Sequence, residues 1–247
     1  QVEADPAVRL ITAFETFFQE RRPFFVEDAR IFDFALSGGS NRLFYGRGIG
    51  RSPTGRAPTG ADHVDLPESA TILGAAKLTG RTPGGLSVGA IAALTDQATG
   101  RAWFEDAKAT RSFVAEPRTF HSAFRARQDF DGGASTVGAI ATLQVRQLPG
   151  DRSFAFLPSE ALSAGFDWEH QWQDRTYAFY GYVAGSHIRG DSTAMIRIQR
   201  ASNHYFQRPD ALRLRVDSTA RSLTGVDWRV TVEKRRGKHW TGSAWAA

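Results

Sequence analysis

The feature that most constrains this chain is a strict two-residue alternation of apolar and polar side chains. In the stretch LSAGFDWEHQW, Phe166, Trp168 and Trp172 fall on even positions, while the odd positions are small, acidic or amide side chains. A period of two residues is typical of a β-strand whose two faces meet different environments. The same alternation recurs in three further runs: residues 120–130, 137–147 and 225–234.

The lengths of these runs and of their connections narrow the fold further. Each run has about 10 residues, which is long for a soluble strand and sufficient to cross a bilayer at a tilt of about 45°. Short turns with Gly, Pro or Asp alternate along the chain with long linkers. The expected turns are 82–85, 131–133, 173–175 and 236–238, and the expected linkers are 96–118, 148–160 and 189–221. Short turns on one side and long loops on the other are typical of outer-membrane barrels.

We therefore predict an all-β fold, an antiparallel transmembrane β-barrel of which this chain contains about 8–10 strands. Residues 61–247 would form the barrel portion, truncated at its C-terminal end, and residues 1–60 an N-terminal lead-in, plug or linker without clean alternation. About eight strands follow residue 70, and one more is expected around residues 42–47. Eight strands can close a small barrel, but truncation of a larger one is the preferred interpretation. A short helix is predicted after the Asp-Ser-Thr capping signal at residues 191–193.

The alternation assigns side chains to the two faces of this barrel. Apolar and aromatic side chains would face lipid or form an interfacial girdle: Phe166, Trp168, Trp172, Tyr177, Val226 and Trp228. The register across the 173–175 turn decides the outward face of the following strand. A two-residue turn would pair Trp172 with Tyr177, and a three-residue turn would pair Trp172 with Thr176. The first register is favoured.

Charged side chains on the opposite face would point into the lumen. These candidates are Arg125, Arg127, Asp129, Arg146, Asp167, Glu169, Asp227, Arg229 and Glu233. Two interpretations remain open, a selectivity ladder for a charged solute and a set of mutually paired charges that fill the interior. The second is favoured, because both signs are present and an uncompensated charge in a confined lumen is costly.

Composition excludes several classes of site and partner. The chain has no cysteine, so it has no disulfide framework and no thiolate metal site. No apolar run is long enough for a transmembrane helix. No signal peptide opens the given sequence, either because it was removed or because this is a piece of a longer protein. The net charge of +5 comes from basic residues that are dispersed along the strands, which argues against a nucleic-acid partner.

Candidate chemistry in the sequence is sparse. The six histidines lack the spacing of a metal site, so no metal and no cofactor are expected. For acyl hydrolysis the nearest candidates are Ser163, His121 with Ser122, and Ser186 with His187. Adjacent strand residues point to opposite faces and cannot form a dyad. GRGIGR at residues 46–51 lacks the G-x-G-x-x-G spacing and favours a backbone turn.

Four stretches in this order, FFQERRPFFVEDARIFDF, LFYGRGIGR, ILGAAKLTGRTPGGLSVG and IQRASNHYFQRPDA, resemble the family called domain of unknown function 5916. The resemblance covers nearly the whole chain. It implies a Gram-negative outer-membrane β-barrel whose members commonly carry an N-terminal domain similar to family 9 carbohydrate-binding modules, a domain absent here. It implies no established activity and transfers no catalytic residue.

These observations predict a non-enzymatic, porin-like outer-membrane protein. Its partners would be outer-membrane lipid and a glycan or small solute, in transport or in surface-associated handling of carbohydrate or another solute. One alternative is a soluble all-β carbohydrate-binding module, with aromatic side chains gathered on a solvent face and no sorted loops. The other is a barrel-borne hydrolase, which needs serine, histidine and an acid on one face.

Overall fold

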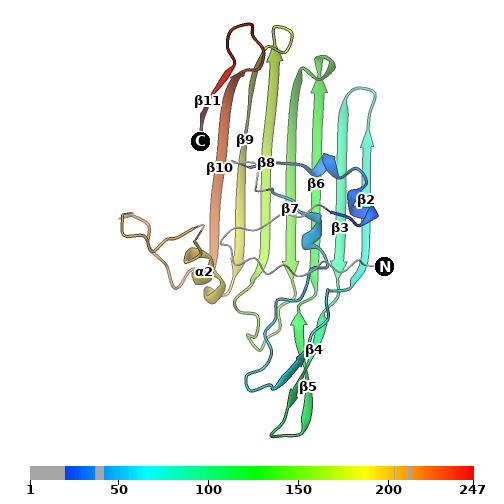
Figure 1. Cartoon of the computed structure of the whole chain (residues 1–247), viewed down its shortest axis with the longest axis vertical. Helices are drawn as coiled ribbons and strands as arrows, with labels where there is room; N and C mark the ends of the chain where they lie inside the picture. The colour runs from blue at the N-terminus through cyan, green and yellow to red at the C-terminus, as the bar shows by residue number, and fades with distance from the viewer. Residues whose placement is uncertain (1–19, 37–41, 203, 211–212) are drawn as a thin grey trace.

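The computed structural model describes residues 20–36, 42–202, 204–210 and 213–247, and within them the chain is mainly antiparallel β-sheet (Figure 1). The large sheet has eight strands in the order β11-β10-β9-β8-β7-β6-β3-β2. Its strands are β2 (Ile72–Arg81), β3 (Leu86–Thr95), β6 (Thr119–Phe130), β7 (Ser135–Arg146), β8 (Pro158–Trp172), β9 (Tyr177–Gly190), β10 (Ser222–Lys234) and β11 (Gly242–Ala246). The all-β antiparallel prediction is confirmed, and the eight strands expected after residue 70 correspond to this sheet.

A second sheet lies beyond the long-loop end of the first. It contains β1 (His63–Asp65), β4 (Ala98–Phe104) and β5 (Ala109–Glu116), in the order β1-β4-β5. Residues 96–118 were predicted as a linker, and this prediction is wrong, because most of the segment is a hairpin. The hairpin leaves the large sheet between β3 and β6, so these two strands pair directly.

The connections are sorted as predicted. The turns β2–β3, β6–β7, β8–β9 and β10–β11 all lie at the top edge of the sheet in Figure 1, and the long connections lie at the bottom. Trp172 pairs with Tyr177, the favoured register, although four residues (173–176) connect them where a two-residue turn was expected. Three of these four have a positive φ, namely Gln173, Asp174 and Arg175.

A short helix, α2 (Ser192–Gln199), occupies the longest connection and confirms the expected one. Asp191 is its N-cap, and its side chain accepts a hydrogen bond from the backbone N–H of Thr193. Among the described residues, no helix is long and apolar enough to cross a membrane.

Residues 20–36, called here the strap, cross one face of the large sheet (Figure 1). The strap contains α1 (Pro23–Val26) and the 3-10 turn η1 (Ala29–Phe32), and a further 3-10 turn, η2 (Gly46–Gly48), follows it. The strand expected around residues 42–47 is absent: only an isolated bridge joins Ala35 to Arg42. Phe17 and Phe18, which open the FFQERRPFF stretch of the predicted N-terminal segment, lie outside the described residues.

The core is formed between the strap and one face of the sheet. Phe25 and Phe32 pack with Ile49, Ile91 and Ala123. Phe34 forms a second cluster, whose sheet residues are Ile140, Tyr182 and Ala184. We call this covered side the inner face and the opposite side the outer face.

The sheet does not close into a barrel within the described residues. β2 and β11 are the end strands, and each pairs with a single neighbour in the described structure. No pairing joins these two edges, so closure of a small barrel by these eight strands is not observed, and truncation of a larger barrel stays a prediction.

Candidate functional site

The strand register separates the predicted side chains cleanly into two sets. All nine predicted lumen residues lie on the inner face, and all six predicted lipid or girdle residues lie on the outer face. For example, Asp167 on β8 pairs with Tyr182 on β9, which pairs with Arg229 on β10. The faces follow the predicted alternation. That one face borders a lumen and the other lipid remains a prediction.

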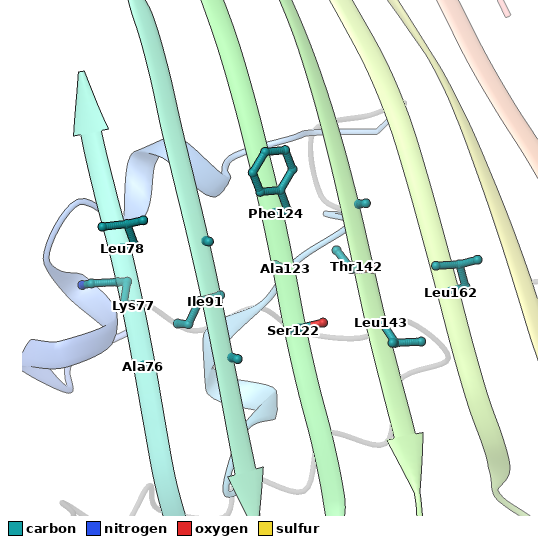
Figure 2. A pocket seen from close by; sticks show the side chains of 13 residues that line it. Ala76, Lys77, Leu78, Ile91, Ser122, Ala123, Phe124, Thr142, Leu143 and Leu162 are labelled. Atoms are coloured by element: carbon teal, nitrogen blue, oxygen red, sulfur yellow. The ribbon is translucent and has the colours of Figure 1, made fainter. Parts of the chain in front are cut away.

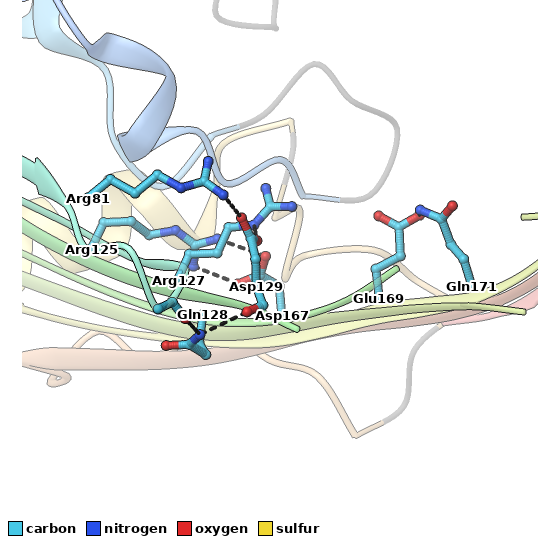
Figure 3. Close-up of polar contacts among 9 residues, drawn as sticks. Arg81, Arg125, Arg127, Gln128, Asp129, Asp167, Glu169 and Gln171 are labelled. Atoms are coloured by element: carbon cyan, nitrogen blue, oxygen red, sulfur yellow. Dashed lines mark hydrogen bonds and ion pairs between the residues drawn. The ribbon is translucent and has the colours of Figure 1, made fainter. Parts of the chain in front are cut away.

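An ion pair occupies the centre of the inner face. Both terminal nitrogens of Arg125 donate to the carboxylate of Asp167, with 2.7 Å between Nη2 and Oδ2 (Figure 3). The Arg125 side chain is only 2% exposed, because the ring of Phe34 covers its guanidinium at 5.4 Å. The absence of a side chain at Gly138 makes room for this ion pair, since a β-carbon there would lie 2.6 Å from Oδ1 of Asp167. The Asp167 side chain is 32% exposed, so the pair is buried mainly on the arginine side. Removal of Asp167 would leave the buried Arg125 charge uncompensated, which is strongly destabilising.

Two further groups of charges lie beside this pair. Asp129 accepts a hydrogen bond from Arg81 at 2.7 Å and lies 3.4 Å from Nε of Arg127. On β9, the hydroxyl of Tyr182 donates to Asp227 at 2.8 Å. The Arg81–Asp129 contact joins β2 to β6 across β3, and the Tyr182–Asp227 contact joins the neighbouring strands β9 and β10.

Toward the turn end, Arg235 bridges two predicted lumen acids. It donates to Glu169 at 2.7 Å and to Glu233 at 2.9 Å. Its hydrogen bond to Glu233 raises the pKa of Arg235, and Glu169 adds to this effect while partial burial opposes it. The guanidinium of Arg229 lies 4.4 Å from the ring centroid of Trp245. The inner face thus favours the interpretation of paired charges over a one-sign ladder.

Arg146 lies apart from the other predicted charges, at the long-loop end of β7. Its Nη1 donates to the carbonyl of Pro158 at 2.9 Å. Next to it, His121 and Gln144 form a cross-strand contact of 3.2 Å between Nδ1 and Nε2. These contacts tie the start of β8 to the sheet.

Two cavities remain between the strap and the sheet. One, of about 680 Å³, is lined by Arg30, Arg81, Arg127 and Asp129 among others. The other, of about 480 Å³, is lined by groups that include Asp33, Phe34, Glu169, Tyr180, Tyr182 and Arg229. Both volumes are in the range of small-molecule sites.

The outer face has a different hollow, shown in Figure 2. It measures about 450 Å³ and is almost entirely apolar. Small residues such as Ala76 and Ala90 line it together with larger ones, of which Leu78, Phe124 and Leu162 are the most exposed. It is a shallow depression in an uncovered apolar surface.

Aromatic rings gather at the turn end of the outer face. Trp172 stacks on Tyr177 with ring centroids 5.6 Å apart, and on His170 at 5.8 Å. Nζ of Lys234 lies 3.7 Å from the ring centroid of Trp240. Rings with one apolar side and a polar or cationic neighbour are typical of a membrane–water boundary.

The predicted serine–histidine candidates do not form a catalytic set. His187 contacts Thr224 at 2.8 Å on the outer face, whereas Ser186 lies on the inner face. His121 and Ser122 likewise lie on opposite faces of the sheet. Ser163 on β8 pairs with Ser186 on β9, so its cross-strand neighbour is a serine and not a histidine. Across the described residues, no group of three metal-ligating side chains is present.

Sequence reasoning missed one serine–histidine contact. Oγ of Ser135 lies 2.8 Å from Nδ1 of His170 on the outer face. The two residues are 35 positions apart, so only the register of β7 against β8 brings them together. In the described part of the chain no carboxylate forms a hydrogen bond with His170, so the pair lacks the orienting group of a triad.

The partners of the predicted charges were also missed, namely Arg81, Tyr182, Arg235 and the covering ring of Phe34. Alternation would have placed Arg81 and Tyr182 on the polar face. No sequence signal pointed to Phe34, because it lies in the segment without alternation.

Known proteins offer one point of comparison. No curated protein and no solved structure is significantly similar to this chain. The model of the family described as Domain of unknown function (DUF5916) matches residues 1–239. The match covers nearly all of the sequence, so this chain belongs to the DUF5916 family.

Proposed function

We propose that this chain is part of an outer-membrane β-barrel protein of a Gram-negative bacterium. Its outer face would contact lipid, and its inner face would border a path for a small polar solute, such as a carbohydrate. The role would be transport or surface-associated handling of that solute, without an enzymatic step.

One observation carries the proposal: the large apolar side chains of the outer face are uncovered. Their exposed fractions run from 37% for Val137 to 72% for Val226. The set spans seven of the eight strands: Leu78, Leu94, Phe120, Phe124, Phe130, Val137, Leu143, Val145, Leu162, Phe166, Phe179, Val183, Val226, Trp228 and Val232. A water-soluble monomer rarely leaves an apolar patch of this extent exposed, and lipid would satisfy it.

Three further features support a membrane setting. Strands β6 to β10 have 12–15 residues, sufficient to cross the hydrocarbon layer at a tilt. The short turns and long connections lie at opposite ends of the sheet. The ring cluster around Trp172 lies at the turn end, where an interfacial girdle would be expected.

The open edges set a condition on this proposal. Unpaired backbone groups are not tolerated in the hydrocarbon layer. The free edges of β2 and β11 must therefore be paired in the membrane, either with each other or with further strands.

Refolding of the full-length protein in detergent micelles tests the proposal. We expect β-rich circular dichroism only when detergent is present, and a band that changes mobility on a gel after boiling. A protein that is β-rich and monomeric in plain buffer, without a heat-dependent shift, would refute the membrane barrel. That result would instead favour the soluble carbohydrate-binding module.

A further inference from the structure

The strap is seated in sockets that the sheet provides. A β-carbon on Gly89 would lie 2.7 Å from Cγ2 of Ile31 and 3.0 Å from Cζ of Phe32. A β-carbon on Gly165 would lie 2.5 Å from Cζ of Phe34. Any larger side chain at these two sheet positions would displace the strap, so the sheet is hollowed where the apolar side chains of the strap sit.

Phe34 and Phe32 are the most buried side chains of the strap, each 4% exposed. Phe34 lies edge-on to Tyr182 with ring centroids 5.8 Å apart, and covers Arg125. The surface beneath it is therefore a mixture of apolar groups and the Arg125–Asp167 ion pair. Rehydration of the buried Arg125 guanidinium recovers solvation free energy, so displacing Phe34 costs less than displacing it from a purely apolar surface.

The hydrogen bonds between the strap and the strands of the sheet are exposed, whereas Arg22 makes part-buried bonds to the carbonyl oxygens of Gly46 and Ile49 outside the sheet. Nζ of Lys77 donates to the carbonyl oxygens of Phe24 and Glu27, the latter at 2.7 Å. The hydroxyl of Thr79 donates to Oδ2 of Asp28 at 2.7 Å. Water competes effectively for such exposed bonds. The two cavities of about 680 and 480 Å³ adjoin the strap and leave room for displacement.

We propose that the strap, residues 20–36, is a built-in occluding segment. It is closed in this structure, with Phe34 as its latch, and it must leave its sockets before a solute can pass along the inner face. This inference rests on the proposed function, since it treats the inner face as the wall of a solute path.

Thiol labelling tests the latch in any solvent that keeps the protein folded. The chain has no cysteine, and Ile140 is 3% exposed in the cluster around Phe34, so Ile140→Cys places a single thiol under the latch. With a charged thiol reagent, we expect at least tenfold faster labelling when Phe34→Ala is added. Phe24→Ala is the matched control, because Phe24 is also in the strap but is 38% exposed and outside the Phe34 cluster; it should leave the rate unchanged. Equal rates with and without Phe34→Ala would overturn the latch.

A disulfide lock tests occlusion without removing Phe34. The Cγ2 atom near Gly89 is bonded to the β-carbon of Ile31, so the pair Ile31→Cys and Gly89→Cys is within disulfide range, roughly 3.5–4.5 Å between β-carbons. In planar bilayers, we expect the oxidised full-length variant to conduct at a tenth or less of the level after reduction. The single variant Ile31→Cys should not respond to reductant.

The outcomes separate the two proposals. Equal conductance before and after reduction would show that the strap is a fixed part of the wall. No conductance in either state would show that reduction does not open a path along the inner face, and either result overturns the occluding role. The heat-dependent mobility of the same samples reports on the barrel independently of the strap. Loss of that shift, with labelling still dependent on Phe34, would refute the membrane proposal and the solute path while retaining the latch.

Discussion

At the scale of single residues, glycine decides what can lie against the inner face. Gly138 makes room for the Arg125–Asp167 pair, and Gly165 makes room for Phe34. These two glycines are required for close approach and not for backbone conformation. Glycine in the interior of a strand normally weakens the sheet, but at these two positions it allows the tertiary contacts to form.

Gly165→Ala should therefore destabilise the fold, by about 1–3 kcal/mol, because the new methyl group overlaps the ring of Phe34. The matched control is Gly185→Ala on β9, where the nearest atom to a β-carbon is 3.8 Å away and no loss is expected. Urea unfolding of the refolded protein in micelles measures both.

The same substitution should be relieved when Phe34→Ala is present. The two changes touch one contact, so a double-mutant cycle should give a coupling of order 0.5–3 kcal/mol. Additive effects would contradict the close packing of Phe34 on Gly165.

At the scale of elements, α2 shows how a long connection is held in place. Gln199, at the end of α2, donates to the carbonyl of Asp217 at 2.9 Å and accepts from its N–H at 2.7 Å. The start of the helix depends on Asp191, which also contacts Arg152 at 3.1 Å. Both ends of this connection are thus fixed by side chains.

The cap of α2 should be sensitive to acid. Its hydrogen bonds with Thr193, with help from Arg152, lower the pKa of Asp191 below its usual value of 3.8. A lowered pKa means that the cap stabilises the helix above pH 3.8 and that this contribution is lost as the pH falls through the folded value. Amide hydrogen exchange in residues 192–199, corrected for intrinsic rates, should accelerate over that range.

Asp191→Asn provides the control for this titration. Asparagine caps helices about as well as aspartate but carries no titratable proton. The corrected exchange of that variant should be flat with pH, and a remaining acid transition would assign the effect to another group.

At the scale of the whole molecule, the two faces of the sheet differ in what they contact. The strap and the ion pairs cover the inner face, and nothing among the described residues covers the outer face. A lipid environment and water make opposite predictions for a charge placed on the outer face.

Val183 and Val64 form a matched pair for this test. Both are valines, 43% and 44% exposed, but Val183 is central in β9 of the large sheet and Val64 lies in β1 of the small one. If the outer face meets lipid, Val183→Arg should cost about 2–4 kcal/mol of folding free energy in bilayers, and Val64→Arg close to none. Similar small effects of both substitutions would argue for a water-exposed sheet.

The features of the fold that could be predicted from the sequence depend on a few consecutive residues. Whether Phe166 and Asp167 share a face depends only on their adjacency in an extended strand, so alternation assigned both correctly. The turn at residues 82–85 was likewise readable, because its Pro and Gly residues restrict the backbone directly. The β4–β5 hairpin was missed because the buried positions at the start of β4 are Ala98, Gly100 and Ala102, whose small side chains give a weak apolar alternation in the sequence.

The sequence by itself determined the strands, their two faces and the ends where the turns lie, because side-chain alternation and turn chemistry act over a few residues. Only the tertiary structure decided which charges meet, where Phe34 sits and that no pairing joins β2 to β11 among the described residues. Arg125 and Asp167 are 42 positions apart, and their contact exists only through the registers of β6, β7 and β8. Such pairing depends on packing between distant segments, for which one strand's pattern carries no information.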